Sequence, residues 1–117
     1  MAAKTLSTPT TATPQVVDRF TGDATANNLR QVDVASATRS LTLRVVTSAG
    51  APMAFRVAHT GTDGAAIGTD YFRLEAGETY AWSVHGTSRQ LGGWSLFVAG
   101  ESADPTIEVI SNLHAGA

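Results

Sequence analysis

The spacing of the three histidines can be compared directly with that of metal-binding motifs. His59, His85 and His114 lie in three separate segments. None of them forms the His-x-His or His-x-x-x-His spacing that places two imidazoles on one metal ion. The sequence therefore predicts no metal site.

Catalytic constellations are equally incomplete. Ser83, His85 and Asp70 have the side-chain types of a nucleophilic triad, but no G-x-S-x-G turn or oxyanion-type glycine loop stands beside them. The Gly-rich stretch 61–68 lacks the Lys-Ser/Thr ending and the following helix of a phosphate loop. Carboxylates could act as an acid/base pair if the fold held two of them about 5–9 Å apart, although turns account for most of those in the second half. We expect no catalytic residue and no cofactor, and hence no enzyme.

The aromatic residues allow two interpretations. Trp82, Trp94, Tyr71 and Tyr80 could build a platform on which a sugar ring stacks. Trp82 and Trp94, however, fall in phase with apolar neighbours along the chain, which favours a place in the core.

Composition restricts the class of partner. The 117 residues suffice for one domain, and only 15% are charged, below the roughly 25% typical of soluble domains. A surface of Thr, Ala and Gly is easily desolvated, as a subunit of an assembly requires. The net charge of −2 leaves no basic stripe for nucleic acid, and no run approaches the ~18 apolar residues of a membrane span. Zero cysteines fit folding in a reducing cytoplasm.

Alternating apolar residues predict an all-β chain. The stretch 70–86 reads as a β-hairpin around the turn Glu75-Ala76-Gly77-Glu78, in which Gly77 suits a position with positive φ. Segments 39–46 and 53–58 read as a second hairpin, with Arg44 and Arg56 on its outer face.

Four further segments, 15–20, 30–34, 94–99 and 106–111, complete the predicted strands. The resulting fold class is an antiparallel β-sandwich, jelly-roll-like, of about 6–8 strands with an extended N-terminal arm. The arm would span residues 1–14 and the single sandwich domain residues 15–117. One core is expected to contain Leu43, Phe55, Phe72, Trp82, Leu96 and Val109.

The predicted interaction surface combines the arm with two outward residues. Residues 1–14 hold five threonines and two prolines, which favour extended backbone and offer little to bury. Order in this arm would then come from a neighbouring molecule, and the alternative is a disordered terminus without a role. Residues 60–69 read as a mobile Gly-rich loop. The predicted interface residues are Thr5, Thr8, Pro9, Thr10, Thr11, Pro14, Phe97 and Ile110.

Residues 39–112 resemble the small β-sandwich virion proteins of tailed bacteriophages. The resemblance rests on SLTLRVVTSAGAPMAFRVAH, a Gly/Ala/Thr loop, DYFRLEAGET and the closing WSLFVAGES…TIEVIS. In such proteins a strand entering a Leu-x-x-Gly-Glu turn precedes the aromatic strand, and here those positions are Leu74, Gly77 and Glu78. Residues 62–68, TDGAAIG, are also similar to a segment of the lambda-like head decoration proteins, which share the small size and the Thr/Pro-rich leading arm.

The resemblance implies a structural protein of the phage particle. The expected function is that of a capsid decoration or cement protein, which would bind the major capsid protein and form a homo-oligomer on the virion after assembly in the bacterial cytoplasm. The alternative is a carbohydrate- or receptor-binding module of a phage head or tail fibre. Exposed aromatic residues in a groove would favour the sugar binder, whereas a flat apolar patch would favour the decoration protein.

Overall fold

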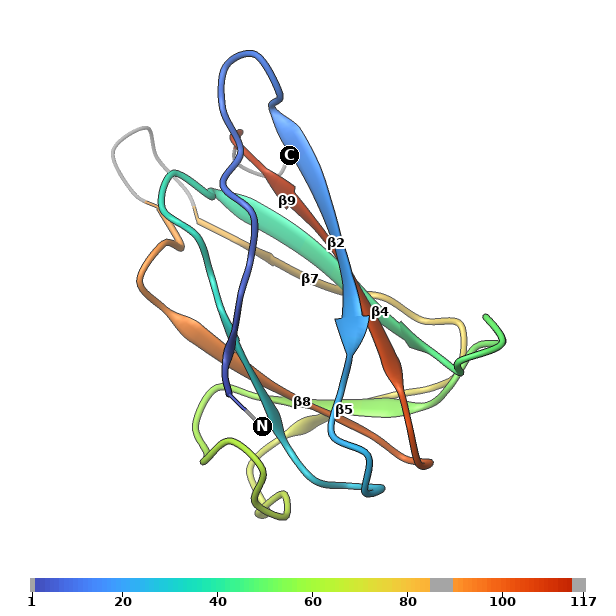
Figure 1. The fold of residues 1–117 in the computed structure, drawn as a ribbon. Coiled ribbons are helices and arrows are strands. Elements are labelled where there is room, and N and C mark those ends of the chain that lie inside the picture. Colours follow the sequence, from blue (N-terminus) through green and yellow to red (C-terminus); the bar gives the residue numbers. More distant parts are fainter. Residues whose placement is uncertain (1, 85–89, 115–117) are drawn as a thin grey trace.

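Two β-sheets make up the computed structural model, which describes residues 2–84 and 90–114 (Figure 1). The four-stranded sheet has the order β2-β9-β4-β7 and is antiparallel throughout. The five-stranded sheet has the order β1-β3-β8-β5-β6, in which β1 runs parallel to β3. The strands are β1 (Lys4–Thr5), β2 (Gln15–Thr21), β3 (Arg30–Asp33), β4 (Ser40–Val46), β5 (Phe55–Ala58), β6 (Phe72–Leu74), β7 (Tyr80–Ser83), β8 (Ser95–Gly100) and β9 (Thr106–Asn112).

The all-β prediction is confirmed, because the described residues contain these strands and no helix. Eight of the strands lie where the alternating patterns predict them. The radius of gyration of 13.4 Å matches the value of about 13 Å expected for one compact unit of this length. Gly77 has a φ of 92°, and the Glu78 amide donates to the Glu75 carbonyl at 3.0 Å, as predicted for this turn.

The prediction of two β-hairpins is wrong, because the two strands of each predicted hairpin do not pair with each other. β4 lies in the four-stranded sheet and β5 in the five-stranded sheet, and β6 and β7 are divided in the same way. Arg44 and Arg56 therefore do not share an outer face. A period-2 pattern fixes which face of a strand is buried, but it does not fix the pairing partner. The connections between these strands are long enough to cross the ~10 Å between packed sheets.

The core lies between the two sheets. Of the six predicted core residues, Leu43, Phe55, Leu96 and Val109 are buried at 1% exposure or less. Trp82 is only partly buried, and Phe72 is 64% exposed. β7 and β6 are edge strands of their sheets, so the inward side chains of both have no neighbouring strand on one side.

Trp94 is not a core residue but is 64% exposed. It precedes β8 and closes a turn in which its amide donates to the Leu91 carbonyl at 3.1 Å. The alternation of apolar residues predicted an inward side chain for Trp94, but the turn directs that side chain away from the core. The neighbouring Leu91 is buried instead, at 1% exposure.

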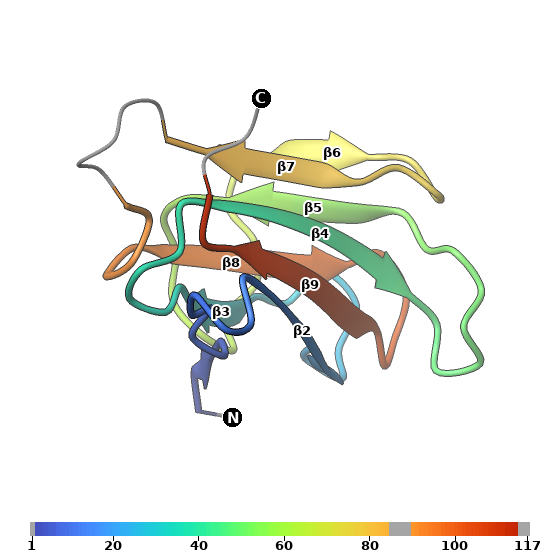
Figure 2. The same cartoon turned by 90° about the horizontal axis from the view of Figure 1, so that it is seen from above.

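The N-terminal segment packs on its own domain. β1 pairs with β3, and Leu6 reaches the core with 3% exposure. The amide and hydroxyl of Ser7 both donate to the Asp18 carboxylate of β2, at 2.9 and 2.8 Å. Figure 2 shows this segment beside β2 and β3, at the side of the molecule opposite β6 and β7. The prediction that residues 1–14 have little to bury is therefore wrong at Leu6.

The Gly-rich loop is also held by its own chain. The Gly64 amide donates to the Leu29 carbonyl at 2.7 Å, and the Leu29 amide donates to the Ala65 carbonyl at 2.8 Å. A Cβ atom at Gly61 would lie 2.5 Å from the Leu29 Cδ1, so the loop packs closely on this buried side chain. Ile67 packs against a second buried cluster that contains Phe97. The predicted mobile loop is thus a cover over the five-stranded sheet.

Candidate binding surfaces

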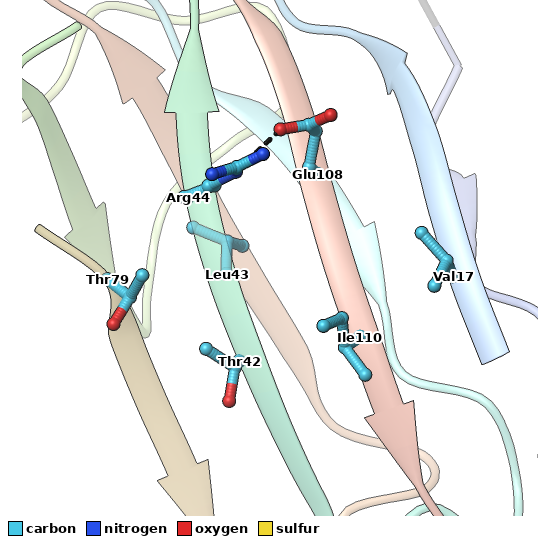
Figure 3. Close-up of a pocket in the computed structure, with 7 residues that line it drawn as sticks. All are labelled: Val17, Thr42, Leu43, Arg44, Thr79, Glu108 and Ile110. Atoms are coloured by element: carbon cyan, nitrogen blue, oxygen red, sulfur yellow. Dashed lines mark hydrogen bonds and ion pairs between the residues drawn. The ribbon is translucent and has the colours of Figure 1, made fainter. Parts of the chain in front are cut away.

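The outer face of the four-stranded sheet, on the side away from the core, carries an uncharged row of side chains. The strand register places Val17, Ile110, Thr42 and Ala81 opposite one another across β2, β9, β4 and β7. Val17 is 69% and Ile110 41% exposed. A shallow hollow of about 370 Å³ lies over this row, and Figure 3 shows the side chains that line it. The outer face is therefore apolar at its centre.

Two ion-paired arginines border this row. Glu108 lies between Arg19 and Arg44, at 3.2 and 2.7 Å from their Nε atoms. Both arginine side chains are more than half exposed, so water screens the pairs and their contribution to stability is small. On the opposite side of the row from these arginines, the register places three uncharged residues, Gln15, Asn112 and Ser83. The outer face as a whole is a polar frame around an apolar centre.

A second network of charges lies on the five-stranded sheet. Glu101 accepts hydrogen bonds from Arg73 at 2.6 Å and from Arg56 at 3.0 Å, and Arg73 also pairs with Glu75. The hydrogen bond from Arg73 is the main cause that lowers the pKa of Glu101. Arg56 and Arg73 are thus neutralised by carboxylates of the same molecule.

We call the group of His59, Phe72, Tyr80 and Trp82 the aromatic edge. It lies at β6 and β7, which are edge strands of different sheets and do not pair with each other. Tyr80 and Trp82 pair in register with Leu43 and Leu41, so they face inward from β7. The His59 Nε2 lies 2.7 Å from the Tyr80 hydroxyl oxygen. The His59 ring also meets the Trp82 ring edge-on, with centroids 4.7 Å apart. His59, which directly follows β5 of the five-stranded sheet, therefore contacts two side chains of β7 in the other sheet.

The aromatic edge is weakly polar. Desolvation by burial lowers the pKa of His59 and raises the pKa of Tyr80. Both shifts favour the neutral forms, so neither ring is charged at pH 7. Two hollows adjoin the edge, one of about 320 Å³ beside His59, Asp70 and Phe72, and one of about 450 Å³ between Trp82 and Trp94.

The predicted interface residues do not form one surface. Ile110 is exposed on the outer face as predicted, whereas Phe97 is 7% exposed beneath the 60–69 loop, so its prediction as an interface residue is wrong. Pro9 is buried, while Thr8 and Pro14 are exposed. Thr5 is exposed although its backbone belongs to β1, and Thr10 and Thr11 lie exposed in the link to β2.

Sequence reasoning missed three features, namely Asp18, Val17 and the aromatic edge. Asp18 is inward-facing and 8% exposed, and its position between Val16 and Phe20 on the buried face was the available signal. Val17 was the outward residue of the same strand. The aromatic edge could not be found without knowing that β6 and β7 belong to different sheets.

The structure places the side chains of residues 2–84 and 90–114. No group of three or more His, Cys, Asp and Glu side chains in this part of the chain could hold a metal ion. His85, the central member of the triad considered above, lies outside the described residues. The same ranges contain no helix that is long and apolar enough to cross a membrane.

Comparison of the chain with protein-family models, with curated proteins and with solved structures finds no match in any of the three.

Proposed function

We propose that this chain is a non-enzymatic structural protein that docks on a protein lattice, as a decoration protein docks on the major capsid protein of a phage head. The outer face of the four-stranded sheet is the observation that carries the proposal. Its row of Val17, Ile110, Thr42 and Ala81 carries no charge, and Val17 and Ile110 expose apolar side chains to a partner. Small side chains lose little conformational entropy when a partner covers them.

The area of this face is too small for a standard protein interface, so other segments must contribute to the docking surface. Three strands of seven residues and one of four, at ~4.8 Å spacing and ~3.3 Å per residue, give a plane of roughly 400 Å². A standard interface buries ~800 Å² per partner, so neighbouring segments must supply about half of it. Pro14 and its neighbours Ala12 and Thr13 adjoin the outer face around a hollow of about 610 Å³. This link between the N-terminal segment and β2 would extend the docking surface.

The strand order supports a finer assignment of the fold as a jelly roll. β2, β9, β4 and β7 form one sheet, and β3, β8, β5 and β6 form the other, so six of the seven successive connections from β2 to β9 cross between sheets. Two interlocked Greek keys produce such an order. Jelly rolls occur in viral capsid and lectin domains, and the step from fold to function here is an analogy.

Location on the virion rests on the resemblance of residues 39–112 to phage virion proteins, together with the low content of charged residues. Copies bound at adjacent lattice positions would form the homo-oligomer. No nucleic acid or membrane partner is part of the proposal.

A binding experiment tests it directly. The purified chain is mixed with emptied capsid shells of the phage whose genome carries it, and the shells are sedimented. We expect saturable co-sedimentation at a fixed ratio to the major capsid protein, and none with shells of an unrelated phage. If the chain does not bind the shells even at concentrations well above the Kd of a weak complex, the proposal is overturned.

A further inference from the structure

We propose that the aromatic edge, with Trp94 beside it, is a binding site for the neutral sugar rings of a glycan. This site lies apart from the outer face, and the inference does not depend on the chain being a decoration protein.

The position of the aromatic rings is the first argument. Tyr80 and Trp82 lie on β7 and face the core. Phe72 lies on β6 and pairs with Val57 of β5, which also faces the core. Rings thus line the inner faces of the two sheets at the edge strands β6 and β7. Figure 2 shows these two strands at one side of the molecule. Phe72 and Trp94 are each 64% exposed, which is unusual for large aromatic side chains. Their faces are available to a ligand.

The arrangement of polar groups is the second argument. A pyranose ring has an apolar C–H face and a rim of hydroxyl groups, so it requires an aromatic face with hydrogen-bonding groups around it. The hollow beside Phe72 has His59 and Asp70 in its wall. The hollow between Trp82 and Trp94 has Gln90, whose Oε1 accepts from the Ala37 amide at 2.6 Å. Each hollow therefore combines a ring with polar groups.

Size and charge favour a sugar over a protein partner. Hollows of about 320 and 450 Å³ fall at the lower end of the range for small ligands, about 300–1,000 Å³. A protein partner requires a broad surface of ~800 Å² instead, which the outer face comes closer to providing. The lowered pKa of His59 favours its neutral form, and the described residues that line the two hollows include no arginine or lysine. Two adjacent hollows suit an oligosaccharide of neutral units.

The test uses the full chain and three defined oligosaccharides, the hexamers of β-1,4-glucose, α-1,4-glucose and β-1,4-N-acetylglucosamine, together with an array of immobilised glycans. Binding is followed by two-dimensional amide NMR, which locates the perturbed residues. We expect at least one glycan to shift amides near His59, Trp82 and Trp94. Trp94→Ala and Phe72→Ala should each weaken binding about tenfold, because both rings are exposed and their loss removes stacking contacts.

Ile110→Ala is the matched control, since it removes an exposed apolar side chain from the outer face and should leave glycan affinity unchanged. Thermal unfolding of all three variants establishes that they are folded. The inference is overturned if neither the three hexamers nor the array shows binding, or if both aromatic variants bind as tightly as the wild type. It is also overturned if these variants lower capsid binding while no glycan binds, because the edge would then belong to the protein-docking surface.

Discussion

Isolated apolar residues in otherwise polar segments act as anchors in this molecule. Leu6 is a lone leucine in a Thr/Pro-rich stretch, and it is buried in the main core. Ile67 is a lone isoleucine in a Gly-rich loop, and it packs against the cluster that contains Phe97. Each converts a segment that looks unstructured by composition into a cover over a sheet. A single large side chain buried in this way contributes about 1.5–3 kcal/mol, which offsets the entropy of ordering only a few residues.

His59 makes folding stability depend on pH. Its folded-state pKa lies below the ordinary value of 6.5, so the unfolded chain binds more protons between these two values. Stability is therefore expected to fall as pH decreases from 7.5 to 5.5. The pKa of Glu101 is lowered from 4.5, so that carboxylate loses its stabilising charge only at lower pH, outside this window. Urea denaturation of the wild type and of His59→Gln, at pH 7.5 and 5.5 and constant ionic strength, measures the difference.

The variant cannot take up the proton, so its urea midpoint should change less between the two pH values than that of the wild type. An equal change in both proteins would show that another group causes the pH dependence. Arg73→Lys is a useful control, because it changes a charged pair that does not titrate in this range.

At the scale of strands, the sequence predicted position and inward face but not pairing. Leu41, Leu43 and Val45 alternate and are buried as expected. Which strand lies beside β4 depends on contacts between residues far apart in the chain, and the alternating pattern is silent about them. The observed neighbours of β4 are β9 and β7, and neither is adjacent to it in sequence. The error therefore came from assuming that consecutive strands pair.

The same limit applies to the candidate surfaces. Ile110 could be predicted because its outward phase in β9 is a local property. Phe97 could not, because its cover is supplied by residues 60–69 and by Leu29, which are distant in sequence. The aromatic edge depends on the separation of β6 and β7 into two sheets, and on a turn that directs Trp94 outward.

The N-terminal segment should stabilise the free protein. Leu6→Ala is expected to lower the free energy of unfolding by about 2 kcal/mol, the lower end of the range for buried leucines, because the terminal segment can detach locally. Thr8→Ala is the matched control, since Thr8 is exposed and should change stability by less than about 0.5 kcal/mol. Urea denaturation of both variants at pH 7 measures the two effects. A Leu6→Ala variant as stable as the control would mean that the segment is free to act as a tether to a neighbour.

At the scale of the whole molecule, the two proposed surfaces face different ways. The outer face is the exterior of the four-stranded sheet, and the aromatic edge opens at the side where β6 and β7 lie (Figure 2). Binding of a lattice to the first would leave the rings of the second exposed. Glu108, at the border of the outer face, and Glu101, on the other sheet, are each paired with arginines of the same chain.

The measurement that tests the central claim most directly is capsid-shell binding by an outer-face variant. Ile110→Asp places a charge at the centre of the apolar row while leaving the core side of β9 unchanged. We expect its affinity for shells to fall at least about tenfold, because the carboxylate must be desolvated without a partner. Trp94→Ala, on the aromatic edge, should bind shells as the wild type does. Full occupancy by a folded Ile110→Asp variant, with wild-type affinity, would contradict the assignment of the outer face as the docking surface.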